Sequence, residues 1–538
     1  MKKTFLLLLF SLFIGVVFAG NTKGWQKPLS HPFSRLSKDS VSVPGTTLVC
    51  AYAKGKGRVA NSYPLYHLNR NTITIDIKAS FKTKDCKNAF LILTSLDYGE
   101  NAVSRDTLCL PLSDDLTTYS KSLTVRCIYA LVVSLEVESA DDDKEGVFSI
   151  ADIDLSSGGE PLSEDAVGYR PPFVDEQDLV EWDNMLHLPF MDKTFLGFGE
   201  TSHGTETYGQ LTYEIMKERI LHHRCKLILL ELPVNDMLYI NRYVKNDERF
   251  NIDSISTFLK RTFFAKSTID FLRWVKTHNA SHQNEISVLG FDLDWDPGRA
   301  ADQMAHYIRS LNVYNVDAVN ELCDSIAVKY APEDVPSLLS MFDRTNLEGV
   351  LDREEVELIR YCISDLQNKE RLGNRDLRMP QLVERIFSQY LTSDATVTFL
   401  GHLGHLNYLT RQCSPVFFDC FSMGNALRKK YGDDYCCIAV GSVGGEAFLV
   451  SRRYVFPKEL ESAPQESIEY QVGKWGKSPV FLSMEKMKST DVYKVREVGQ
   501  SYSNKQFNYL IPRNAMDGII VVVKAERNKH REIERISF

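Results

Sequence analysis

The chain has 538 residues, of which 43% are hydrophobic and 25% are charged, with 30 glycines and 19 prolines. This composition is typical of a globular protein and excludes a collagen-like, low-complexity or wholly disordered chain. The formal net charge is -8 and no long Lys/Arg run occurs, which argues against a sequence-independent hold on nucleic acid. At roughly 150 residues per domain, the length allows several domains.

The first 19 residues have the pattern of a secretion signal. Lys2 and Lys3 give a positive start, Phe5–Phe18 form an apolar run, and small residues precede a cleavage site after Ala19. Because the run is short for a membrane span, a cleaved signal is favoured over an anchor. We therefore expect residues 1–19 to be a signal peptide of bacterial type. The mature chain is then periplasmic or secreted and has no membrane span.

Residues 20–157 are expected to form an all-β domain. Short alternating apolar runs recur there, as in Thr72–Ile77 and Leu131–Val137, with turn residues and no helical pattern between them. Strands at such spacing are typical of a β-sandwich or jelly roll. The closing run, Phe148–Leu155, resembles the last strand of galactose-binding-like modules, which implies a glycan as a candidate partner. A purely structural sandwich is the alternative.

Residues 158–165, which include Gly158, Gly159 and Pro161, are interpreted as a linker to a second domain at residues 166–538. In the second domain, apolar strands alternate with amphipathic helices. This alternation predicts an α/β domain with a largely parallel sheet flanked by helices. The predicted strands are 195–199, 226–232, 286–293, 396–400 and 435–440, and the predicted helices are 206–224, 235–244, 254–278 and 299–328.

Carboxylates and imidazoles occur where four of these strands end. They are Glu200 and His203 after the first strand, Glu231 in the second, Asp292 in the third, and His402 and His405 after the fourth. In an open parallel sheet, ligands bind in the crevice outside the carboxyl ends of the strands. We therefore expect these side chains to share one site.

Such a set of side chains suits the activation of water. A neutral histidine can take a proton from water near pH 7, and a neighbouring carboxylate fixes its tautomer. A second histidine can stabilise an oxyanion. No GxSxG motif occurs, which argues against a serine hydrolase. A metal site would use the same ligand types, but HExxH is absent. We expect no metal or other cofactor and keep a metal-dependent hydrolase as the weaker alternative.

The order of the motifs resembles that of the erythromycin esterase family. The first family motif reads GEATHGT, and Gly199–Thr205 here reads GETSHGT. Further matches follow in the family's order along the chain. They are KLILLE at 226–231, Phe271–Asn279, Gly290–Asp292, Arg375–Asp376, Gly401–His405 and Met423–Asp434.

The resemblance implies an erythromycin esterase-like fold and a carboxylic ester hydrolase that uses water without a covalent serine intermediate. It assigns the general base to His203, with Glu200 or Glu231 orienting it. His402 and His405 would stabilise the oxyanion or the leaving group. The implied partner is a small-molecule ester or lactone.

We assign substrate binding to Asp292, Arg375 and Thr212. The family usually has a basic residue at the position of Thr212, and Leu403 replaces the asparagine between its paired histidines. Because a lost cation changes which anion a pocket holds, we expect a substrate other than a macrolide. The alternative from another class is a binding protein that holds a glycan or other ligand on the same fold without turnover.

Overall fold

The computed structural model divides the chain into two compact units, whose main segments meet between Arg170 and Pro171. Each unit has its own hydrophobic core. The predicted signal peptide lies outside the residues that the structure describes. These are 25–26, 35–40, 47–54, 56–62, 65–66, 72–97, 102–126, 129–141, 144–162, 169–252, 265–294, 296–311, 316–328, 333–345, 347, 350–366, 375–409, 422–451, 454–499, 506–528 and 534–535.

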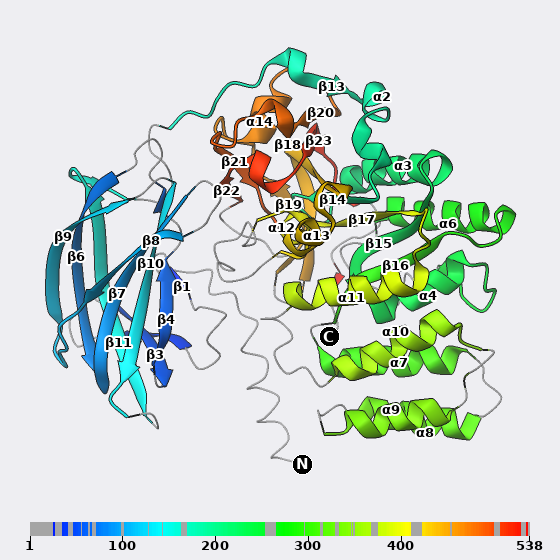
Figure 1. The fold of residues 1–538 in the computed structure, drawn as a ribbon, viewed down its shortest axis with the longest axis horizontal. Coiled ribbons are helices and arrows are strands. Elements are labelled where there is room, and N and C mark those ends of the chain that lie inside the picture. The colour runs from blue at the N-terminus through cyan, green and yellow to red at the C-terminus, as the bar shows by residue number, and fades with distance from the viewer. Residues whose placement is uncertain are drawn as a thin grey trace. The chain divides into compact units, whose positions relative to one another are not determined.

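The N-terminal unit is an all-β sandwich of two antiparallel sheets, which confirms the predicted fold of this part (Figure 1). One sheet has the order β1-β4-β10-β7-β8 with β5 beside β10, and the other has β2-β3-β11-β6-β9 with β12 beside β11. The strands are β1 (Trp25–Gln26), β2 (Arg35–Ser40), β3 (Thr47–Lys54), β4 (Lys56–Ser62), β5 (Leu65–Tyr66), β6 (Thr72–Lys84), β7 (Cys86–Leu96), β8 (Ala102–Cys109), β9 (Thr117–Arg126), β10 (Ala130–Ser139), β11 (Glu145–Ser157) and β12 (Glu160–Pro161).

Strand β6 shows how the sequence builds this unit. Its side chains alternate between exposed and buried from Thr72 onward, so that Ile73 and Ile75 face the core. Phe81 of β6 stacks on Phe148 of β11 with ring centroids 5.2 Å apart. The core therefore comes from the inward-facing half of each alternating run.

The start of the predicted linker is instead a tight hairpin. Gly158 and Gly159 have φ angles of 61° and 88°, the left-handed conformation that a two-residue hairpin turn needs. The chain then returns as β12, which pairs with the end of β11. Leu162 packs against the sandwich core. Among the described residues, the connection between the units therefore lies after Leu162.

The C-terminal unit contains a largely parallel sheet flanked by helices, as predicted. Its order is β13-β20-β23-β18-β14-β17-β15-β16, with β19 beside β18 and β24 beside β19. The six strands from β23 to β16 are parallel to their neighbours, and the other pairings are antiparallel. The strands are β13 (Leu179–Glu181), β14 (Phe195–Glu200), β15 (Cys225–Pro233), β16 (Ser287–Asp292), β17 (Thr396–His402), β18 (Tyr435–Ser451), β19 (Tyr454–Leu460), β20 (Val480–Ser483), β23 (Gly518–Ala525) and β24 (Glu534–Arg535), with a separate hairpin of β21 (Tyr493–Arg496) and β22 (Phe507–Leu510).

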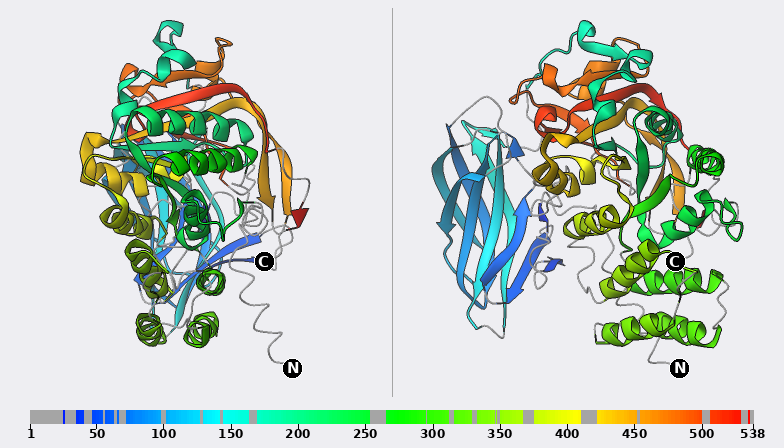
Figure 2. Two further views of the ribbon diagram at one scale, coloured as in Figure 1. Left: turned by 90° about the vertical axis from the view of Figure 1, so that its right-hand side faces the viewer. Right: turned by 45° about the vertical axis from the view of Figure 1, so that its right-hand side comes forward.

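The helices of this unit form two groups at the sheet and a stack beyond it. Helices α3, α4 and α6 connect strands in the direction from β14 toward the edge strand β16, whereas α11 and α13 connect strands in the opposite direction, from β16 toward β18. Because crossovers between parallel strands are right-handed, the two groups lie on opposite faces of the sheet. Beyond β16, α7 packs against α8, and α9 packs against α8 and α10 (Figures 1 and 2). The helices are α2 (Trp182–Met185), α3 (Glu206–His222), α4 (Val234–Val244), α6 (Lys266–Ser281), α7 (Pro297–Ser310), α8 (Val316–Val328), α9 (Val335–Arg344), α10 (Arg353–Asp365), α11 (Arg375–Tyr390), α12 (Leu403–Leu406), α13 (Met423–Tyr431), α14 (Ile468–Gly473) and α15 (Pro512–Ala515).

One predicted helix is divided in the structure. The pattern at 299–328 belongs to α7 and α8, which the described part of the chain shows as separate helices. Pro297 begins α7, and the side chain of Asp296 caps it by accepting the amide of Gly298 at 2.9 Å. Within the described ranges, no helix is long and apolar enough to cross a membrane.

Candidate active site

The structure brings polar side chains together at the carboxyl ends of four parallel strands. Glu200 of β14 stands opposite His402 of β17 in the strand register. Asp292 at the end of β16 stands opposite Pro233, two residues beyond Glu231 of β15. Neighbouring β14 and β17 lead to helices on opposite faces of the sheet, and such a switch point opens a crevice at the strand ends.

His203 lies between two carboxylates in this crevice. Its Nδ1 is 3.1 Å from Oε2 of Glu200, and its Nε2 is 3.7 Å from Oε2 of Glu231. The first distance is a hydrogen bond and the second is not. Burial raises the pKa of Glu200, and the bond to His203 partly offsets this effect. Glu200 therefore orients the ring through Nδ1 and leaves Nε2 directed toward Glu231.

Glu231 connects the members of the cluster. Its Oε2 accepts the backbone N–H of His402 at 2.5 Å, and its Oε1 accepts from Arg375 at 2.8 Å. Burial acts to raise the pKa of Glu231, but His405, His203 and Arg375 outweigh it and hold this pKa well below its usual range. A Cβ atom at Gly401 would lie 2.9 Å from the Glu231 carboxylate, so the glycine leaves room for this side chain.

Arg375, the first residue of α11, binds Asp292 with two parallel hydrogen bonds. Its Nε donates to Oδ1 at 2.9 Å and its Nη2 donates to Oδ2 at 2.6 Å. Such bidentate pairs are geometrically specific. Burial disfavours the charge, yet Asp292 and Glu231 outweigh it and raise the pKa of Arg375. Two of the three residues assigned to substrate binding, Arg375 and Asp292, are therefore in the cluster, where they bind each other and Arg375 also binds Glu231.

His405 faces two carboxylates and one guanidinium. Its Nδ1 is 2.7 Å from Asp376 Oδ1, and its Nε2 is 3.3 Å from Glu231 Oε1. Nη1 of Arg375 also lies 3.1 Å from Nε2. Burial and Arg375 act to lower the pKa of His405, but the two carboxylates outweigh them and raise it to about 10. His405 is therefore an imidazolium at neutral pH.

His402 presents a donor that has no partner among the described residues. The backbone N–H of Gly404 donates to its Nδ1 at 3.2 Å, so the proton of a neutral ring resides on Nε2. Burial and the neighbouring His203 hold the pKa of His402 well below its usual value. Its Nε2 is buried and makes no hydrogen bond to any described residue, and its ring centroid lies 5.1 Å from that of His203.

Two positions where the chain departs from the family pattern have local roles. Thr212 is fully buried in α3. Its hydroxyl donates to the carbonyl oxygen of Tyr208 at 2.9 Å, and Gly209 O lies at 3.2 Å, so this donor is not offered to a ligand. Leu403 packs closely against Gly199, since a Cβ atom added to Gly199 would lie 2.7 Å from Cδ1 of Leu403. Neither residue replaces a lost cation.

The structure adds two residues to the site that the sequence patterns do not assign to it. Asp376 belongs to the Arg375–Asp376 motif, and its position beside Arg375 on α11 is the sequence signal that points to it. Val498 supplies backbone partners to the His203 loop, because its N–H donates to Thr201 O at 2.8 Å and its C=O accepts from His203 N at 3.2 Å. Nothing in the local sequence at Val498 signals this contact.

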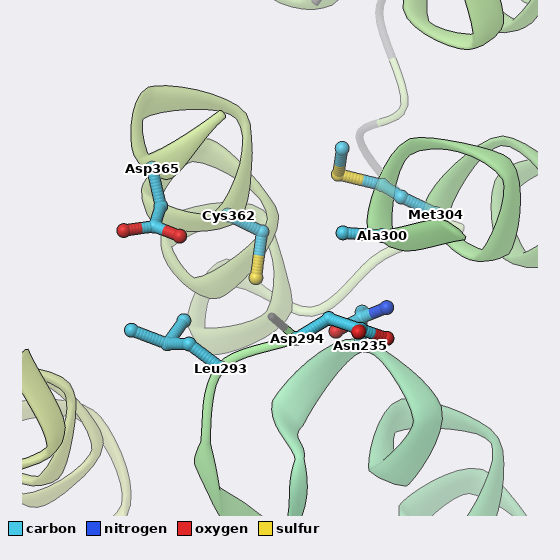
Figure 3. A pocket seen from close by; sticks show the side chains of 7 residues that line it. All are labelled: Asn235, Leu293, Asp294, Ala300, Met304, Cys362 and Asp365. Carbon is cyan, nitrogen blue, oxygen red and sulfur yellow. The ribbon is translucent and has the colours of Figure 1, made fainter. Parts of the chain in front are cut away.

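A small hollow is lined by residues of α4, α7 and α10 and by two residues that follow β16 (Figure 3). It encloses about 240 Å³ of empty space, part of which is open solvent. Arg299 pairs with the Asp294 carboxylate and Arg378 with that of Asp365. Each of the two carboxylates at the hollow therefore has a guanidinium partner. The lining residues are Asn235, Leu293, Asp294, Ala300, Met304, Cys362 and Asp365. The hollow shares no residue with the histidine–carboxylate cluster.

The described residues include no group of three His, Cys, Asp or Glu side chains that could hold a metal ion. The carboxylates of the cluster instead face cations of the protein. Arg375 pairs with Glu231 and Asp292. His405 pairs with Asp376. Glu231, Asp292 and Asp376 are therefore each paired with a cationic side chain of the protein.

Comparison with known proteins places this arrangement among relatives. A family model described as "Erythromycin esterase" matches residues 220–525. A Bacillus cereus protein of known structure is 16% identical, with 65% of this chain and 93% of that chain covered and a TM-score of 0.52. A succinoglycan biosynthesis protein is 15% identical, with 66% and 95% covered and a TM-score of 0.50.

A mutant of the erythromycin esterase EreC in its open conformation is 15% identical, with 66% of this chain and 96% of that chain covered and a TM-score of 0.47. No curated protein matches this chain significantly. The family match includes Glu231, Arg375, His402 and His405, and it begins after Glu200 and His203. Similarity to the first two structures, at such low identity, concerns the fold alone.

Proposed function

The chain belongs to the erythromycin esterase family, and from this premise we propose that it hydrolyses a carboxylic ester or lactone with water activated by His203. One observation carries the proposal. A histidine base held by Glu200 lies beside His402, whose buried Nε2–H has no partner in the described part of the chain. Hydrolysis of an acyl group needs such a base and such a donor close together.

In the proposed reaction, Nε2 of His203 takes a proton from water while the water oxygen attacks the carbonyl carbon. The Nε2–H of His402 donates to the carbonyl oxygen as it becomes an oxyanion. When the tetrahedral intermediate collapses, the C–O bond to the leaving group breaks and His203 returns its proton to the departing alkoxide. The products are a carboxylic acid and an alcohol, or one hydroxy acid from a lactone.

The fixed charges around this pair have a supporting role. Glu231 accepts the backbone N–H of His402 and so holds the donor ring at the end of β17. The imidazolium of His405 and the Arg375 guanidinium keep Glu231 ionised. The charge on His405 also favours a developing oxyanion nearby. Because Thr212 supplies no cation, we propose that the natural substrate is not a macrolide.

The signal-like N-terminus supports the further proposal that the mature enzyme is exported. The all-β unit is proposed to bind a glycan.

The decisive experiment is to screen the purified protein against a panel of esters and lactones in H₂¹⁸O. We expect one ¹⁸O atom in the carboxylate product of a single turnover and no acylated protein. A covalent acyl-enzyme would contradict direct attack by water. Saturable binding of panel members without turnover would identify a binding protein instead.

A further inference from the structure

A second group of buried polar side chains joins the hairpin of β21 and β22 to α14, and Figure 1 shows these elements close together. Arg496, the last residue of β21, has no exposed surface. Its Nη2 donates to the carbonyl oxygen of Glu461 at 2.6 Å and lies 3.3 Å from that of Val443. Its Nη1 donates to Gln506 Oε1 at 2.8 Å. The guanidinium thus connects the hairpin to the middle of β18 and to the segment after β19.

Glu469 of α14 holds the same residue from its backbone. Its Oε1 accepts the N–H of Arg496 at 2.7 Å, and its side chain is fully buried. Burial raises the pKa of Glu469 to about 7, which the charge of Arg496 partly offsets. Arg496 is therefore held at both its guanidinium and its amide, although none of these groups reaches the reacting cluster.

The anchored strand leads directly to the catalytic loop. Glu497 N–H donates to Gln506 O at 2.7 Å, which continues the hairpin ladder past Arg496. Val498 comes next, and it forms an isolated parallel bridge with Ser202. Its N–H and C=O pair with Thr201 O and His203 N. The backbone of His203 is therefore held by the C-terminal hairpin as well as by β14.

We propose that Arg496 and Glu469 are positioning residues that set the catalytic geometry of His203 through Val498. The inference rests on the proposed function of His203. A base must stay within a fraction of an ångström of its productive position, because a 1 Å displacement can cost about 10²-fold in rate. Loosening Arg496 releases Val498 and lets the His203 loop shift while the rest of the sheet remains in place.

The chain offers a matched control in Arg219. This arginine is equally buried, and its guanidinium donates to the backbone carbonyl oxygens of Met191, Lys193 and Val397. In both arginines Nε has no partner among the described residues. Arg219 lies at the opposite end of the sheet, where β14 and β17 begin, so its loss disturbs folding without touching the His203 loop.

The test compares Arg496→Lys with Arg219→Lys in the full chain. We expect both to lower the melting temperature similarly. Only Arg496→Lys should lower kcat, by about tenfold or more, with KM changed less than threefold. In addition, hydrogen exchange of the peptide around His203 should accelerate at least tenfold in Arg496→Lys relative to Arg219→Lys. Normal kcat and normal exchange in a folded Arg496→Lys protein would overturn the proposal.

Glu469 keeps the proposal testable if Arg496→Lys fails to fold. Glu469→Leu removes the acceptor for the Arg496 amide and should lower kcat, whereas Glu469→Gln retains an acceptor oxygen and should recover most of it. Equal kcat values for Glu469→Leu and Glu469→Gln would contradict the proposed positioning role of Arg496 and Glu469. The exchange measurement needs no substrate, so it separates this proposal from the hydrolase assignment. If the wild-type chain hydrolyses no ester, but exchange around His203 is still faster in Arg496→Lys than in Arg219→Lys, only the proposed function is overturned.

Discussion

Glu200 and His402 stand opposite each other in the register of β14 and β17, although 202 positions separate them in the sequence. This pairing places the partner of the proposed base and the proposed oxyanion donor on adjacent strand ends. The distance between the His203 and His402 rings, 5.1 Å between centroids, follows from it. The following predictions test what this arrangement does.

Replacement of His203 by alanine should lower kcat by roughly 10²–10⁴-fold, the usual contribution of a general base. Folding should remain intact, because the ring contacts polar groups of the cluster, namely Glu200, Glu231 and His402. The matched control is His222→Ala, since the His222 side chain is 62% exposed and lies outside the cluster. Steady-state kinetics and circular dichroism check the result. A His203→Ala enzyme with near-normal kcat would disprove the assignment.

Replacement of His402 by alanine should lower kcat by roughly 10²–10³-fold, the cost of one oxyanion donor. The effect should fall mainly on kcat and leave KM nearly unchanged, because the donor acts on charge that develops in the transition state. Steady-state kinetics with substrates that differ in their leaving group measures the effects on kcat and KM separately. A rise in KM alone would show that His402 binds the substrate in its ground state.

Replacement of Arg375 by glutamine should lower both stability and activity. Glu231 and Asp292 would keep buried charges without their partner, and breaking such a pair costs roughly 3 kcal/mol of unfolding free energy. Arg299→Gln is the control, because Arg299 joins Asp236 and Asp294 and is similarly exposed, at 28% against 29% for Arg375. We expect similar denaturation midpoints for the two variants, with activity lost only in Arg375→Gln. Equal activities would separate Arg375 from the reaction.

The charge on His405 should make stability depend on pH in a defined direction. Its pKa is raised from 6.5 to about 10 in the folded chain, so the folded state holds this proton more tightly than the unfolded state. The stabilisation is fully present below pH 6.5 and is lost as the pH rises toward 10. The unfolding free energy of the wild type minus that of His405→Gln should therefore shrink over this range, as urea denaturation can show. A difference that stays constant or grows with pH would contradict an imidazolium at His405.

Prolonged chelation should leave activity and melting temperature unchanged. The reason is that Arg375 and His405 already bind the carboxylates of Glu231, Asp292 and Asp376. Assays before and after dialysis against a strong chelator test this, with added Zn²⁺, Mn²⁺ or Mg²⁺ as the recovery step. Loss of activity that one divalent ion restores would favour a metal-dependent hydrolase.

Local sequence patterns determined which segments of this protein become strands and helices, and which polar residues stand at strand ends. The alternation in β6 and the apolar run of β15 encode a period and a burial pattern, and these depend on neighbouring residues alone. The positions of Glu200, Glu231 and His402 followed from these boundaries. Gly158 and Gly159 also carried a hairpin signal, which the expectation of a linker overlooked.

Only the tertiary structure decided which of these residues bind one another. The pairs Arg375–Asp292 and His405–Asp376 join residues 83 and 29 positions apart, so they depend on strand order and on where α11 crosses the strand ends. The state of each charge depends on the same contacts, because burial and neighbouring charges act together on every pKa in the cluster. Val498 meets His203 only because the hairpin of β21 and β22 folds against β18. Such long-range contacts leave no periodic pattern in the local sequence, so they cannot be predicted from it.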